Sequence, residues 1–101
     1  MELKRKVHKA ERDANLVEAK SSLAEVQDSV AFYGLTMNVF GHKPGQTPEW
    51  QFFGEGRPVL KYWPTTKNSM DFKTNEYRVL SGPEEAMELA IDKFFAQRKV
   101  G

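Results

Sequence analysis

The chain of 101 residues is long enough for one hydrophobic core, and we expect a single domain over residues 1–101. Its 15 lysine and arginine residues against 14 aspartate and glutamate residues give a formal net charge of +1. This balance excludes an acidic nucleic-acid mimic and the strongly basic field of a dedicated duplex-binding protein. The chain has no cysteine, which excludes disulfides and thiolate chemistry and fits a cytoplasmic protein.

The amino-terminal residues 1–6 are basic, but no apolar segment follows them, so we expect no secretory signal peptide. No apolar run elsewhere approaches the roughly 18 residues that a transmembrane helix needs. The sequence therefore predicts a protein of the cytoplasm that makes no contact with a membrane.

Residues 3–33 contain neither glycine nor proline and predict one long helix or two consecutive helices, ending at Gly34. We expect residues 15–34 to pack on the domain, because their apolar residues recur at intervals of three and four: Leu16, Ala19, Leu23, Val26, Val30 and Tyr33. A second apolar seam lies on another face and consists of Leu3, Val7, Ala10, Ala14 and Val17. We expect residues 1–14 to be a basic, solvated helical arm that frays. The two seams also permit a homodimer through this helix.

Residues 35–80 are predicted to form the sheet. Alternating side chains and β-favouring residues indicate short strands near residues 35–39, 50–53, 59–63, 70–72 and 77–79, with turn residues between them. Strands so closely spaced predict an antiparallel meander of three to four strands.

Residues 82–99 are predicted to form a carboxy-terminal helix. Ser81 and Glu84 have the spacing of a capping box at its start. We expect its buried face to contain Ala86, Met87, Ala90, Ile91, Phe94 and Phe95. The whole pattern predicts an α+β fold: a long N-terminal helix, the antiparallel meander, and a C-terminal helix packed on one face.

The sequence gives little support for catalysis or metal binding. His8 and His42, the only histidines, fall on different elements, and no cysteine accompanies them. The run Gly54-Glu55-Gly56 lacks the helix that a phosphate-binding loop needs and predicts a hairpin turn. We therefore expect a non-enzymatic protein with no catalytic residue, no metal and no cofactor.

The segment from Trp50 to Tyr77 holds seven of the twelve aromatic residues, interleaved with cations. Tyr62 and Trp63 are successive in a predicted strand and therefore face opposite sides of the sheet. An exposed ring beside a cation can stack on a nucleic-acid base, or it can anchor a protein interface. A third interpretation places most of these rings in the core. The candidate binding residues are Arg57, Lys61, Tyr62, Trp63, Thr65, Thr66, Lys67 and Asn68.

The run Tyr62-Trp63-Pro64-Thr65-Thr66, with Val59 before it and Gly82 and a helix after it, resembles a segment of small, uncharacterised bacteriophage and prophage proteins. The resemblance covers residues 59–94. It departs at residues 67–70, Lys-Asn-Ser-Met, where a Gly-Lys-Trp-like continuation is expected. The resemblance implies a phage-type origin and an accessory role, and it supplies no catalytic residue.

The leading hypothesis is a small phage-type or prophage-type accessory protein that binds single-stranded or distorted nucleic acid through an aromatic–basic sheet face. The alternative is an interaction module that uses the same rings to bind and modulate a host enzyme or defence complex. The partner is thus nucleic acid or a host protein, in the cytoplasm of the host cell. Burial of all three of Trp50, Tyr62 and Trp63 would exclude base stacking.

Overall fold

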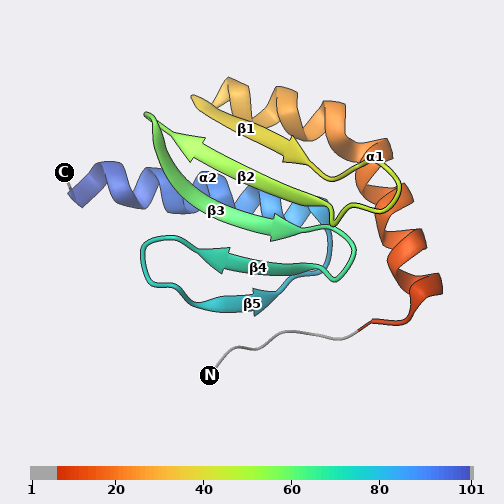
Figure 1. The fold of residues 1–101 in the computed structure, drawn as a ribbon. Helices are drawn as coiled ribbons and strands as arrows, with labels where there is room; N and C mark the ends of the chain where they lie inside the picture. The colour runs from red at the N-terminus through yellow and green to blue at the C-terminus, as the bar shows by residue number, and fades with distance from the viewer. Residues whose placement is uncertain (1–6, 101) are drawn as a thin grey trace.

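The computed structural model describes residues 7–100, and the side chains of residues 7–98. The predicted α+β fold is confirmed, and the sheet is a meander in the order β1-β2-β3-β4-β5 with every neighbouring pair antiparallel. Both helices lie on the same face of this sheet and pack against each other (Figure 1). The elements are α1 (Lys9–Phe32), β1 (Leu35–Phe40), β2 (Glu49–Gly54), β3 (Arg57–Trp63), β4 (Asn68–Asp71), β5 (Tyr77–Val79) and α2 (Pro83–Val100).

The prediction of three to four strands was wrong, because the sheet has five. All five predicted segments pair in one sheet. The long loop after β1 does not separate that strand from the others, since Leu35–Phe40 pairs along its whole length with Glu49–Gly54.

Helix α1 begins at Lys9, and the part of the predicted helix within residues 1–6 lies outside the described residues. Ala19, Val26 and Val30 are buried, as the spacing predicted, whereas Tyr33 lies beyond the last turn and is exposed. On the described helix the second seam is exposed at Ala10, Ala14 and Val17, and Val17 is 69% exposed, whereas Leu3 of this seam lies outside the described residues. The helix therefore packs mainly through the face predicted for its second half.

The turn between β2 and β3 follows the sequence prediction. Glu55 and Gly56 both have positive φ angles, of 54° and 77°, which suit a two-residue hairpin turn. A bulge at Phe52 and Phe53 shifts the register of the pair, so that Leu60 lies opposite Phe52 and Tyr62 opposite Trp50. These four side chains therefore share the face that the helices cover.

The core lies between that sheet face and the two helices. It combines the sheet residues with small side chains of α2, Ala86 and Ala90, that let this helix approach closely. Gly54 has no side chain where the ring of Phe94 packs on β2, and a Cβ there would collide with the ring. The start of α2 is capped by Glu85 rather than by the predicted Glu84. Its Oε1 accepts the Ser81 backbone N–H at 2.6 Å, because the helix begins at Pro83 and Glu85 is its third residue.

Candidate binding surface on the open sheet face

Neither α1 nor α2 covers the second face of the sheet (Figure 1). This open face carries a row of aromatic side chains. Strand alternation turns Lys61 and Trp63 of β3 to this face, opposite to Tyr62. Lys61 pairs with Met70, and Met70 pairs with Tyr77, so residues of β3, β4 and β5 form one row. We call Lys61, Trp63, Phe72 and Tyr77 the ring strip.

Side chains of the ring strip that are neighbours in space contact one another. The rings of Trp63 and Tyr77 are stacked, with centroids 6.1 Å apart and an angle of 11° between their planes. The ammonium of Lys61 lies 5.5 Å from the Trp63 ring and 5.6 Å from the Phe72 ring, within the range of cation–π attraction. All four side chains are half-buried. The strip is thus an ordered aromatic surface with one cation in it.

The positive charge of Lys61 is partly neutralised by a carboxylate of the neighbouring strand β2. Its ammonium lies 3.8 Å from Glu49 Oε2 on β2, and the same carboxylate oxygen accepts a hydrogen bond from Gln51. This face therefore offers ring surface and polar groups, with little net positive charge.

Tyr62, a predicted binding residue, is fully buried, and so is Trp50. This placement corrects the prediction for Tyr62, because alternation along β3 directs its ring into the core beneath α1 and α2. Burial and the nearby carboxylates of Glu18 and Glu85 raise the pKa of its hydroxyl, which finds no hydrogen-bond partner among the described residues. Trp63 is half-buried on the opposite face, so of the three rings Trp50, Tyr62 and Trp63 only Trp63 is not fully buried.

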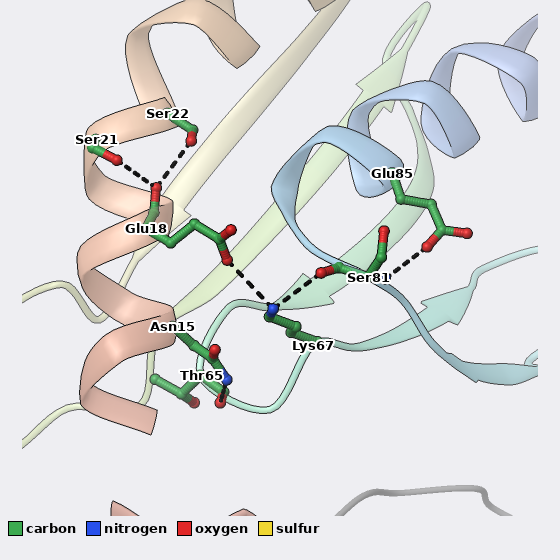
Figure 2. Close-up of polar contacts among 8 residues, drawn as sticks. All are labelled: Asn15, Glu18, Ser21, Ser22, Thr65, Lys67, Ser81 and Glu85. Atoms are coloured by element: carbon green, nitrogen blue, oxygen red, sulfur yellow. Dashed lines mark hydrogen bonds and ion pairs between the residues drawn. The ribbon is translucent and has the colours of Figure 1, made fainter. Parts of the chain in front are cut away.

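Two of the predicted loop residues, Thr65 and Lys67, make contacts within the protein, as Figure 2 shows. Lys67 Nζ donates to the Ser81 carbonyl at 3.0 Å and lies 3.4 Å from Glu18 Oε1. Asn15 donates from its side-chain amide to the Thr65 carbonyl at 2.7 Å. These contacts join α1, the loop between β3 and β4, and the start of α2. We call Asn15, Glu18, Thr65, Lys67 and Ser81 the loop clamp.

Thr66 in this loop bonds to Asn68, the first residue of β4, whose side-chain amide donates to the Thr66 hydroxyl at 2.9 Å. Arg57 lies elsewhere, at the start of β3, and lines a small hollow with Glu55, Gln97 and Arg98. Of the eight predicted residues, the structure thus brings only Lys61 and Trp63 together on the open face. Phe72 and Tyr77 were not among the predicted residues. Their place on the open face follows from how β3, β4 and β5 pair, and the types of the neighbouring residues do not reveal that pairing.

A second group of aromatic side chains is exposed to solvent, and the sequence did not predict it. Phe32, Tyr33 and Phe95 are 82%, 43% and 38% exposed. Tyr33 makes edge-on contacts with Phe32 at 5.1 Å and with Phe95 at 5.9 Å. Phe95 was predicted to be buried, but its neighbour Phe94 fills the core, and one helical step turns Phe95 toward solvent. We call these three residues the exposed ring cluster.

The described residues contain no group of three or more histidine, cysteine, aspartate or glutamate side chains that could hold a metal ion. Within the same residues, no helix is both long enough and apolar enough to span a bilayer. The predicted homodimer through the N-terminal helix stays a prediction.

Comparison with protein-family models gave no match for this chain. Searches of the curated proteins and of the solved structures also gave none. The resemblance of residues 59–94 to phage proteins therefore stays a prediction.

Proposed function

We propose that this protein is a small, non-enzymatic accessory protein that binds single-stranded nucleic acid through the ring strip. The observation that carries the proposal is the ordered row of Trp63, Tyr77 and Phe72 around Lys61 on a sheet face that neither helix covers. Every base has a π-face, so rings on an open sheet can hold a strand with little regard to its sequence.

A single strand fits this face better than a duplex does. Duplex binding relies on many phosphate contacts, whereas the net charge is +1 and the cation of the strip is shared with Glu49. Stacking on one aromatic side chain contributes about 1–3 kcal/mol per base, which suits a surface rich in rings and poor in charge. The phage-type origin and the setting in the host cytoplasm belong to the same proposal.

The test is a titration of fluorescently labelled 12-nucleotide single strands, followed by anisotropy at low salt. Trp63→Ala should weaken binding by about tenfold or more, because it removes one stacking ring. Phe53→Ala is the matched control, since Phe53 is half-buried on the neighbouring strand but lies outside the ring strip. Wild-type protein that leaves the strands unbound, or equal losses in the two variants, would contradict the proposal.

A second candidate function is the binding of a host protein, and the exposed ring cluster favours it. Large rings that are exposed together are typical of interface anchors. In this case Phe32→Ser should abolish capture of a partner from host lysate, whereas Trp63→Ala should leave it intact. The opposite pattern, with capture lost only in Trp63→Ala, would assign the partner to the ring strip.

A further inference from the structure

A cleft of about 660 Å³ lies beside the loop that follows the ring strip. The first half of α1 forms one wall, and the loop between β1 and β2, residues 41–48, forms another. Thr65, a member of the loop clamp, and its neighbour Thr66 complete the lining of the cleft. Three segments distant in sequence thus enclose one hollow.

The lining of this cleft is basic, although the whole chain is nearly neutral. Lys9, Arg12 and Lys20 of α1 and Lys43 of the loop face a single carboxylate, Asp13. Asp13 is already bonded to Lys9, at 2.9 Å. Within the described part of the chain, the other three cations have no carboxylate at ion-pairing distance, and all three are exposed. Their positive charge is therefore not neutralised locally.

The cleft also contains neutral hydrogen-bond donors. Trp50 donates its indole N–H to His42 Nε2 at 3.0 Å, so the neutral imidazole carries its proton on Nδ1. Burial and the ammonium of Lys20 lower the pKa of His42, which keeps the ring neutral at pH 7. The Thr66 hydroxyl accepts from Asn68, which leaves its own hydrogen available to donate. Cations together with N–H and O–H donors are what a phosphate group requires.

We infer that this cleft binds the phosphate groups of the strand whose bases stack on the ring strip. The inference rests on the proposed function. Trp63 and Thr65 are two residues apart, so at most about 7 Å of backbone separates the strip from the cleft wall. The cations that the sheet face lacks are thus supplied by α1 and the loop before β2.

The test compares the salt dependence of single-strand binding in two double variants. Lys20→Gln with Lys43→Gln removes cleft charges, and Arg57→Gln with Lys73→Gln removes two exposed charges outside it. Each lost phosphate contact lowers the slope of log affinity against log salt by about 0.7 for single strands. The cleft variant should therefore lose about 1.4 from the slope, and the control variant should keep the wild-type slope. An unchanged slope in the cleft variant would overturn the inference and leave stacking on the ring strip intact.

A second measurement separates failure of the inference from failure of the proposed function. Inorganic phosphate is titrated into the ¹⁵N-labelled full chain, and the amide signals of residues 43, 45–47 and 65–66 are followed. Shifts that disappear in the cleft variant support a phosphate site even if wild-type protein leaves single strands unbound. In that event the natural ligand of the cleft is a free phosphate ester, and only the proposed binding of single strands is contradicted. If neither phosphate nor strands perturb these amides, the cleft is not a phosphate site.

Discussion

Lys67 combines an unfavourable backbone conformation with two favourable side-chain contacts. Its φ angle is +63°, in the left-handed region that glycine adopts easily. The Trp63 carbonyl accepts the backbone N–H groups of both Thr66 and Lys67, which holds the loop in this tight form. The Lys67 side chain offsets the backbone cost through the loop clamp.

Two substitutions at Lys67 separate these effects. Lys67→Met removes both polar contacts and should lower the free energy of unfolding by about 1 kcal/mol. Lys67→Gly loses the same contacts but relieves the backbone, so it should be more stable than Lys67→Met by about 1 kcal/mol. Urea unfolding measures both values. A glycine variant less stable than the methionine variant would show that the loop is not strained at this residue.

Asp71 is buried and holds β4 to α2. Its carboxylate accepts from Lys93 Nζ at 2.5 Å and from the backbone N–H of Lys73 at 2.8 Å. Burial alone would raise the pKa of Asp71, but these hydrogen bonds outweigh it and lower the pKa below the ordinary value of 3.8. The group therefore contributes stability above that ordinary value, and the contribution is lost as the pH falls through the lower, folded-state pKa.

Asp71→Asn should cost about 2 kcal/mol of stability at pH 7, because it removes the charge that Lys93 meets. The difference from wild type should shrink as the pH falls below 3.8 and through the lower folded-state pKa, where the wild-type carboxylate also becomes neutral. Urea unfolding at a series of pH values measures this difference. Asp92→Asn, at an exposed position on α2, is the control and should show no such trend. A difference independent of pH would exclude the ion pair as its cause.

At the scale of the elements, the contact of Phe94 with Gly54 is the closest steric restraint described between α2 and the sheet. Phe94 packs against Gly54 where any Cβ would collide with its ring. The contact fixes how far α2 lies above β2, and thereby how tightly the covered sheet face closes.

Gly54→Ala should destabilise the protein by about 1–3 kcal/mol through overpacking, although the φ angle of Gly54 is not positive. Phe94→Leu should partly rescue it, so the double variant should lose less stability than the sum of the single variants. Gly45→Ala is a useful comparison, because Gly45 has a φ angle of +81° and nothing within 4 Å of an added Cβ. Additive losses in the Gly54→Ala, Phe94→Leu pair would contradict the steric explanation.

The elements were largely predictable because their patterns are local. Spacing along residues 16–30 gave the packed face of α1, and alternation gave the positions of the strands. What local patterns could not give is which partner a residue meets across the fold. Lys67 was predicted to bind a ligand, yet it bonds to Glu18 and Ser81, which are 49 and 14 residues away in sequence (67 − 18 and 81 − 67). Phe95 and Phe94 look alike in the sequence, and only the approach of α2 to β2 separates them.

At the scale of the whole molecule, the chain has one face closed by helices and one open face of rings. The exposed ring cluster lies outside both the core and the ring strip, so its removal should leave the fold unaffected. Phe32→Ser should change the free energy of unfolding by less than about 0.5 kcal/mol, because the ring is 82% exposed. Phe94→Ala should cost about 3–5 kcal/mol. Thermal or urea unfolding of both variants checks this contrast, and a large loss in Phe32→Ser would place that ring in the core.

The hydrogen bond from Trp50 to His42 gives the molecule an optical reporter. Trp50 is one of two tryptophans and is fully buried, so a Trp63→Phe variant emits light from a single indole in the core. That indole donates to an imidazole that lines the cleft, and an anion that meets the other nitrogen of the ring changes the strength of this bond. The emission of Trp50 should therefore shift when phosphate enters the cleft, and no attached dye is required to see it.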